Sequence, residues 1–317
     1  MGRADVNKHP HATDPVLPQD IVRRLAGRFL ADRRLTDGFE VDESGGEARV
    51  YLLGEDVVVK TQRPHRRRPL TSLRKEAEVL DLLALSLSDR IPRLHGYGTA
   101  ETEMGQVEFL VMSRVLGRAV AHRPVTGARR EQLLADVAGT LRGIHAADLQ
   151  KMHDPGLLPH GGGDDSVALH RRLRDGFAAL VDAIAVRPGR WSLSVSPDEV
   201  MSAALAALPS TLVQPAVLLH SEPGPTHVFV DAAGSFTGMI DFGDAYRSHP
   251  ALDLRGWPDP ADRVRLAAAY LGSGPADTEF EAVWTVAMIH ADMTALVRQA
   301  DAAEQAGQDL AARLSAL

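Results

Sequence analysis

The sequence predicts an α+β fold made of two lobes, with an antiparallel sheet and a helix in the first lobe and mainly helices in the second. Two observations predict this division. Between residues 39 and 60, short runs of β-branched residues alternate with turns that contain glycine, as expected for strands joined by hairpins. From residue 132 onwards, most segments instead repeat apolar residues at helical spacing. We expect a flexible arm over 1–18, an N-terminal lobe over 19–115 and a C-terminal lobe over 116–317.

The elements of the first lobe follow from local patterns. Apolar residues recur at helical spacing from about residue 20 to residue 30, with Asp20 as the candidate N-cap. Further along, the pattern predicts strands at 39–42, 48–53 and 57–60, a helix at 73–85 and a buried strand at 107–115.

The second lobe is expected to be helical except for one stretch. Periodic apolar residues predict helices at 132–145, 167–186, 196–208, 261–271, 278–300 and 302–317. Between residues 218 and 241, three short apolar runs are joined by tight polar loops, and we interpret them as strands.

Composition excludes several classes of site. The chain has 317 residues, no cysteine and a formal net charge of −7, so disulfides, thiolate metal sites and cysteine nucleophiles are excluded. The negative charge argues mildly against a nucleic-acid partner. No apolar run approaches the roughly 18 residues that a membrane span needs, and the N-terminus lacks the apolar region of a secretory signal. We therefore expect a cytoplasmic protein that binds neither membrane nor nucleic acid.

Two groups of residues suggest chemistry on phosphates. Ser44, Gly45 and Gly46 lie in a turn before a strand, and glycines let backbone N–H groups approach phosphates closely. Lys60 ends a stiff β-branched strand, where it forms a fixed point charge. Each feature alone is more often an ordinary turn or a solvated strand end, and their spacing strengthens both. The basic segment 61–75 is either a solvated loop or an electrostatic guide for a nucleotide.

A second group follows the short strands of residues 218–241. His220 and Glu222 come directly after the first apolar run, and Asp241 comes after the third. Polar groups at the ends of buried strands are held rigidly and open onto solvent, where a catalytic base or a metal ligand is useful.

These motifs together resemble the aminoglycoside phosphotransferase family, which has a protein-kinase-like fold. The resemblance covers about residues 40–255, and the order of the motifs carries it. They are Lys-Glu-Ala-Glu-Val-Leu at 75–80, Ile-Pro-Arg-Leu-His-Gly-Tyr-Gly at 91–98, His-Ser-Glu at 220–222, Ile-Asp-Phe-Gly at 240–243 and His-Pro-Ala-Leu-Asp-Leu at 249–254.

The resemblance implies a role for each candidate residue. Lys60 and Glu76 would grip the phosphates of ATP or GTP beneath the turn at 44–46, and the main chain of Ser113 and Val115 would read the base. His220 and Glu222 would be the catalytic residues, and Glu222 would orient the acceptor hydroxyl. Mg²⁺ would be held by Asp241, with His227 as a second candidate ligand.

His249 stands where the family has Asp, and three residues of the catalytic loop also depart from the family pattern. Ser221 stands where the family has Gly, Glu222 where it has Asp, and His227 where it has Asn. Glu222 keeps a carboxylate but adds one methylene, about 1.5 Å of bond length. Because Mg²⁺ prefers oxygen ligands to imidazole, His227 either joins the metal site or binds phosphate directly.

The expected function is transfer of phosphate from ATP or GTP to a hydroxyl of a small molecule, foremost an antibiotic such as an aminoglycoside, macrolide or nucleoside, which would confer resistance. Two alternatives stay open: a catalytically impaired protein that binds nucleotide or drug, and a metabolic small-molecule kinase. The sequence leaves the oligomeric state open. Six acidic residues either line a site for a cationic acceptor or are solvated helix faces: Asp253, Asp259, Asp262, Glu279, Glu281 and Asp292.

Overall fold

The computed structural model describes residues 16–30, 37–43, 45–63, 66, 68, 70–103, 105–191, 193–274, 276–298 and 303–317. Ser44 and most of the predicted N-terminal arm lie outside these residues. The described chain forms two compact units. Unit 2 contains the described residues of 3–159 and 220–245, and unit 1 those of 160–219 and 246–317. The lobe boundary expected after residue 115 stays a prediction.

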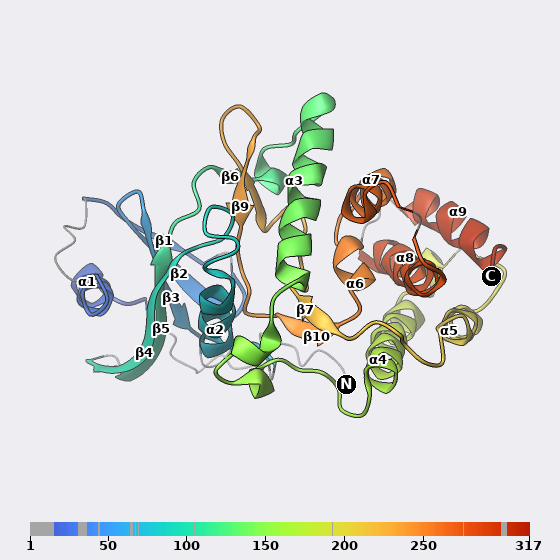
Figure 1. Ribbon diagram of the computed structural model, residues 1–317, viewed down its shortest axis with the longest axis horizontal. Helices are drawn as coiled ribbons and strands as arrows, with labels where there is room; N and C mark the ends of the chain where they lie inside the picture. Colours follow the sequence, from blue (N-terminus) through green and yellow to red (C-terminus); the bar gives the residue numbers. More distant parts are fainter. Residues whose placement is uncertain are drawn as a thin grey trace. The chain divides into compact units, whose positions relative to one another are not determined.

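Unit 2 is built around an antiparallel five-stranded sheet (Figure 1). The strand order is β1-β2-β3-β5-β4, so β3 lies at the centre. The strands are β1 (Phe39–Asp42), β2 (Ala48–Leu53), β3 (Val57–Gln62), β4 (Leu94–Thr102) and β5 (Gly105–Ser113). The three strands expected between residues 39 and 60 are therefore confirmed, and the third extends two residues beyond Lys60.

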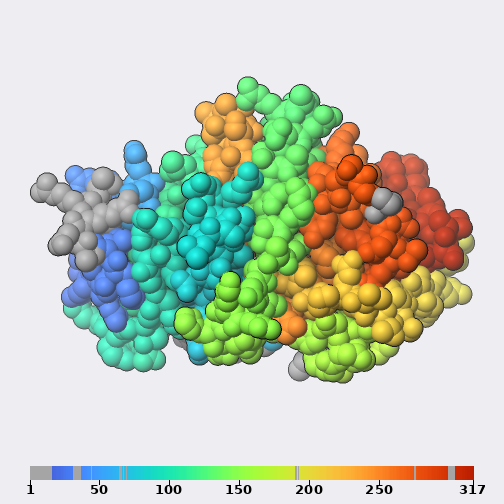
Figure 2. All heavy atoms as spheres, viewed as in Figure 1, coloured from blue at the N-terminus to red at the C-terminus, as the bar shows by residue number. Residues whose placement is uncertain are grey.

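Two helices cover the sheet. Buried residues of α1 (Gln19–Gly27) form one apolar cluster with alternate sheet residues such as Tyr51, Val57 and Val59. Successive side chains in a strand point to opposite faces, so Val58 and Lys60 lie on the other face. That face meets α2 (Leu73–Leu83), which packs on β3, β4 and β5. Side chains fill the space between these ribbons in the view of Figure 2.

Unit 2 also contains a β-hairpin. Strands β8 (Val228–Val230) and β9 (Phe236–Met239) pair antiparallel, with the short β6 (Arg118–Ala119) beside β8. The Asp231 carboxylate accepts the backbone N–H groups of Ala233 and Ser235, which fixes the hairpin turn. The other elements of unit 2 are α3 (Ala128–His145) and the 3₁₀ turns η2 (Val120–His122), η3 (Leu149–Lys151) and η4 (Pro155–Leu157).

Unit 1 is mainly helical, as expected for the C-terminal part. A two-stranded ribbon of β7 (Val217–Leu219) and β10 (Tyr246–Ser248) accompanies its helices. These are α4 (Asp165–Val186), η5 (Pro188–Arg190), α5 (Pro197–Ala206), α6 (Ala251–Leu254), α7 (Pro260–Leu271), α8 (Thr278–Arg298) and α9 (Ala303–Leu314).

The expectation that no segment is long and apolar enough to cross a membrane was wrong for helix α8, which meets that condition by length and composition, and 61% of its most apolar window is buried inside the protein. Its buried residues contact α4, α6 and α9, which is the arrangement of a core helix.

One local expectation was wrong. Helix α1 begins after Pro18, and Asp20 lies in the first helical turn instead of capping it. Its carboxylate there still faces the positive end of the helix dipole.

Candidate active site

Lys60, Glu76 and Asp241 meet at one point in unit 2. The β3 alternation directs Lys60 toward α2, and Ser72 caps α2 so that Glu76 lies in its first turn. Lys60 Nζ donates to Glu76 Oε1 and Oε2 at 2.8 and 3.0 Å and to Asp241 Oδ1 at 2.8 Å. The structure thus brings together three residues that the sequence analysis placed in the phosphate and metal sites. Glu78, two residues further along α2, accepts the Asp154 backbone N–H.

The Lys60 ammonium lies between two carboxylates of like charge, Glu76 and Asp241. The Lys60 ammonium holds the pKa of Asp241 well below its usual range, so this carboxylate is ionised. Burial alone would lower the pKa of Lys60, but Asp241 and Glu76 outweigh it and raise that pKa. Burial raises the pKa of Glu76, against the opposing charge of Lys60. The side chains of Lys60 and Glu76 are 8% and 1% exposed, whereas Asp241 is 45% exposed and therefore open to a ligand.

The loop after β9 holds Asp241 in an uncommon backbone conformation. Asp241 has φ 73°, a left-handed value that costs a non-glycine residue free energy, although Asp is among the residues that tolerate it best. The backbone N–H of Phe242 donates to Glu76, and the buried Lys75 Nζ donates to the Ala245 carbonyl at 2.8 Å. Neighbouring residues of α2 therefore anchor the Asp241 loop at both ends.

The loop that follows β7 carries three of the residues that depart from the family pattern. His220 is fully buried, packs on the Phe242 ring and donates through Nε2 to the Ile240 carbonyl at 3.0 Å. This contact gives His220 a part in positioning the Asp241 loop, and its catalytic assignment stays a prediction. Ser221 adopts φ 88°, so a side chain occupies a position whose backbone favours glycine. Glu222 is exposed.

His227 connects this loop to Asp241. Its Nδ1 donates to the Glu222 carbonyl at 2.8 Å, and its Nε2 lies 3.4 Å from Asp241 Oδ2. Because Nδ1 donates to the Glu222 carbonyl, Nε2 is the ring nitrogen that faces the carboxylate. An ionised oxygen and an imidazole nitrogen at this separation suit neighbouring ligands of one divalent cation, with Asp241 the better donor for Mg²⁺. The described residues contain no group of three or more acidic or histidine side chains placed to hold a metal.

The predicted nucleotide contacts other than Lys60 and Glu76 are backbone groups. A side chain at Gly45 would meet the Ala48 carbonyl oxygen at 2.9 Å, whereas the space around Gly46 is open. The N–H of Ser113 is already bonded to the Arg93 carbonyl at 2.8 Å. Among the described residues, none forms a hydrogen bond with the main chain of Val115. Its N–H and C=O groups are therefore available to the base of a nucleotide. Ser44 lies outside the described residues, and its role stays a prediction.

Two basic residues that the sequence analysis did not assign also contact this region. Lys75 anchors the Ala245 carbonyl, as described above. Arg68 contacts both Glu47, in the glycine turn, and Asp244, which also accepts a hydrogen bond from Thr71. The cluster of positive charge at 61–75 is a sequence signal for such contacts, but it does not indicate which arginine makes them.

Most acidic residues considered for a cationic acceptor have structural partners in unit 1. Asp253, Asp262 and Asp292 are fully buried, and Asp292 binds both Arg263 and Arg313 at 2.9 Å. Asp259 caps α7, and Glu279 accepts the backbone N–H groups of Val213 and Gln214. The expectation of solvated helix faces was wrong for Asp253, Asp262, Asp292 and Glu279, whereas Asp259 is exposed at the start of α7 and Glu281 is exposed on α8.

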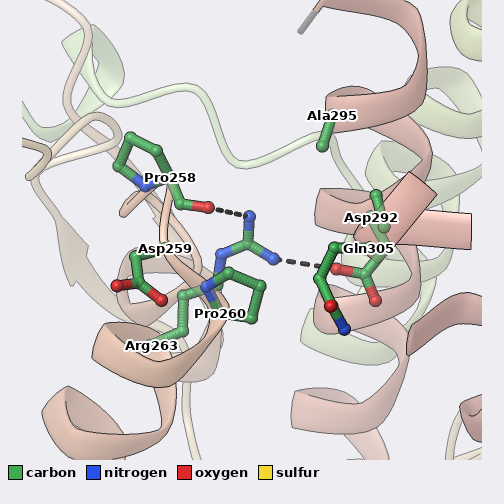
Figure 3. A pocket seen from close by; sticks show the side chains of 8 residues that line it. Pro258, Asp259, Pro260, Arg263, Asp292, Ala295 and Gln305 are labelled. Atoms are coloured by element: carbon green, nitrogen blue, oxygen red, sulfur yellow. Dashed lines mark hydrogen bonds and ion pairs between the residues drawn. The ribbon is translucent and has the colours of Figure 1, made fainter. Parts of the chain in front are cut away.

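A pocket of about 260 Å³ lies in unit 1 beside this ion-pair network (Figure 3). Its walls include Pro258, Pro260, Ala295 and the buried Arg263–Asp292 pair. The Arg263 guanidinium is bonded to Asp292 and to the carbonyls of Trp257 and Pro258. The lining contains none of the predicted catalytic, nucleotide or metal residues, so the pocket adds nothing to the phosphate chemistry.

Comparison with known proteins agrees with the phosphotransferase chemistry expected from the sequence. The phosphotransferase enzyme family matches residues 38–284. No curated protein sequence matches the chain. Among solved structures, the GDP complex of wild-type aminoglycoside 2'-phosphotransferase-IIIa is similar, with a TM-score of 0.62 and 17% identity over 94% of this chain and 99% of that chain.

Two further structures share the fold. The apoenzyme of macrolide 2'-phosphotransferase MphH from Brachybacterium faecium has a TM-score of 0.59 and 20% identity, over 92% of this chain and 98% of that chain. The streptomycin-ATP-APH(2")-IIa ternary complex has a TM-score of 0.52 and 14% identity, over 96% and 97%. These likenesses confirm the two-lobed kinase-like fold. The family match confirms the resemblance found in the sequence: the chain belongs to the phosphotransferase enzyme family and is a small-molecule phosphotransferase.

Proposed function

We propose that this protein transfers the terminal phosphate of ATP or GTP to a hydroxyl group of a small-molecule antibiotic. The observation that carries the proposal is the Lys60 ammonium bonded at once to Glu76 and to the ionised Asp241. Phosphoryl transfer is catalysed mainly by positioning and by charge, and a fixed cation beside a metal-binding carboxylate supplies both.

Each residue has a defined task in this scheme. Glu76 holds the Lys60 ammonium at the end of β3, where it contacts phosphate oxygens. Glu222, exposed in the loop after β7, accepts a hydrogen bond from the acceptor hydroxyl and directs its oxygen at the phosphorus. The hydrogen bond from His220 to the Ile240 carbonyl holds the Glu222 loop next to the Asp241 loop.

Asp241 and His227 would hold the divalent cation, for which Mg²⁺ is the expected species. When bound, such an ion neutralises charge on the phosphate oxygens. The alternative role for His227, direct contact with phosphate, also agrees with its position 3.4 Å from Asp241. Electron paramagnetic resonance with Mn²⁺ in place of Mg²⁺ distinguishes the two roles of His227, because the electron spin of Mn²⁺ couples to a directly bound imidazole nitrogen. Loss of that coupling in His227→Asn would assign the ligand without any measurement of activity.

The nature of the acceptor rests on two observations. Structures with this fold include phosphotransferases described as acting on aminoglycosides and macrolides, which supports an antibiotic hydroxyl. Of the six acidic residues considered for a polycationic acceptor, Asp253, Asp262 and Asp292 are buried and Glu279 binds two backbone N–H groups. Those four therefore give no support to a strongly cationic acceptor, and macrolides and nucleoside antibiotics belong in any panel beside aminoglycosides.

The test is an acceptor panel incubated with ATP and, separately, with GTP. The expected result is an antibiotic that gains the mass of one phosphoryl group, with no gain for Asp241→Asn. A gain confined to central metabolites would favour the metabolic-kinase alternative. Tight nucleotide binding with no gain for any acceptor would favour the impaired, binding-only alternative.

A further inference from the structure

Arg68 connects two loops of unit 2, the glycine turn after β1 and the loop that carries Asp241. Its guanidinium contacts Glu47, in the glycine turn between β1 and β2, and Asp244, three residues after the proposed metal carboxylate. Thr71, which shares Asp244, comes within 3.3 Å of where a side chain at Gly243 would lie, and Asp241 Oδ1 within 3.9 Å of the same point. The bridge therefore lies beside the Lys60–Asp241 pair.

The contacts of Arg68 are replaceable. The glycine turn is held independently, because the Glu47 carbonyl accepts the Arg63 N–H and the Gln62 side chain, both at 2.9 Å. Asp244 keeps its bond with Thr71. The Arg68 side chain is 47% exposed, against 16% for Glu47 and 25% for Asp244, so the guanidinium is the accessible member of both ion pairs. Arg68 can thus change partners without loss of the surrounding structure.

Arg68 is the cation of this cluster that can most readily reach a phosphate. Four carboxylates gather here, from Glu47, Glu76, Asp241 and Asp244. Lys60 is 8% exposed and already bonded to two carboxylates. Lys75 and Arg63 are buried and donate to the carbonyls of Ala245 and Gly45. The Arg68 side chain is instead 47% exposed, and its planar fork of N–H groups matches the oxygens of a phosphate better than an ammonium does.

We propose that Arg68 is a phosphate-binding residue, which exchanges Glu47 and Asp244 for oxygens of the nucleoside triphosphate. This inference rests on the proposed function, because it requires a nucleotide at Lys60. It adds a second cation to the phosphate site and selects triphosphates over nucleosides. Glu47 acts in the opposite direction, because it competes with the phosphates for the same guanidinium.

Two variants that break the same ion pair test the proposal. Arg68→Gln removes the guanidinium, whereas Glu47→Gln removes its competitor and leaves Arg68 in place. Calorimetry gives dissociation constants for ATP against adenosine and for GTP against guanosine. Arg68→Gln should weaken triphosphate binding about tenfold or more, as for loss of a charged hydrogen bond, with nucleoside affinity within about twofold. Glu47→Gln should bind triphosphate as tightly as wild type or tighter. The triphosphate affinity of Arg68→Lys should lie between the affinities of Arg68→Gln and wild type.

The other outcomes overturn the inference in separable ways. Equal weakening of triphosphate and nucleoside by Arg68→Gln, or equal behaviour of Arg68→Gln and Glu47→Gln, would make Arg68 a structural bridge only. Unchanged triphosphate affinity in Arg68→Gln would remove it from the phosphate site while the proposed function stands. If wild-type protein binds neither triphosphate, the proposed function and this inference fail together. Thermal unfolding of each variant shows whether it is folded.

Discussion

Replacing Glu222 with Asp shortens the side chain by one methylene and withdraws the carboxylate by about 1.5 Å. The backbone cannot follow this change. The Glu222 carbonyl accepts the Gly224 N–H and the His227 Nδ1–H, both at 2.8 Å, and the next two residues, Pro223 and Gly224, are buried. Displacement of a catalytic group by about 1 Å can lower a rate about 10²-fold. We therefore expect kcat of Glu222→Asp to fall about 100-fold, a loss of about 2.7 kcal/mol of transition-state stabilisation.

The assay is steady-state transfer of phosphate to the best acceptor of the panel, with nucleotide affinity measured separately. Glu222→Asp should bind nucleotide as wild type does, because the carboxylate meets the acceptor and not the donor. Glu222→Gln keeps the length and removes the charge, so it separates position from basicity. A Glu222→Asp variant with equal or higher kcat would refute the reasoning, since the loop would then not be adapted to the longer side chain.

Three other predictions concern stability. Glu76→Gln leaves the buried Lys60 ammonium with Asp241 as its remaining carboxylate. Chemical denaturation should therefore show a loss of about 3 kcal/mol in the free energy of unfolding. A loss within error of zero would contradict the importance of the buried pair. Ser221→Gly should raise that free energy by about 1 kcal/mol, because glycine adopts φ 88° without strain; destabilisation would show that the serine side chain compensates. Partial burial raises the pKa of Asp165, but hydrogen bonds from the Ala216 N–H and from His160 outweigh it and hold the pKa below its ordinary value of 3.8. Since the unfolded chain takes up this proton first, the stability from Asp165 is present above about pH 4 and is lost on acidification, and Asp165→Asn should flatten that part of a pH titration of melting temperature.

The sequence predicted the residues whose roles depend on local pattern. Lys60 follows three β-branched residues in a strand, and Glu76 lies one turn into a helix capped by Ser72, so both positions follow from short-range rules. The three apolar runs between residues 218 and 241 became β7, β8 and β9 for the same reason.

Contacts between distant residues were out of reach. Lys75 meets the Ala245 carbonyl across 170 residues and Arg68 meets Asp244 across 176, and no local periodicity encodes either pairing. Local patterns also fail to predict the burial of acidic residues. Asp292 can be buried because Arg263 and Arg313 neutralise its charge, and neither arginine is adjacent to it in the sequence. The sequence pattern of α8 shows where Asp292 lies on the helix but not that two arginines cover it.

The most direct test of the central claim is transfer of phosphate from labelled ATP or GTP to an antibiotic by wild-type protein, Glu222→Gln and Asp241→Asn in parallel. The account predicts one antibiotic with a single added phosphoryl group on a hydroxyl, and little or none with either variant. Labelled product formed equally by wild type and both variants would contradict the assignment of this site.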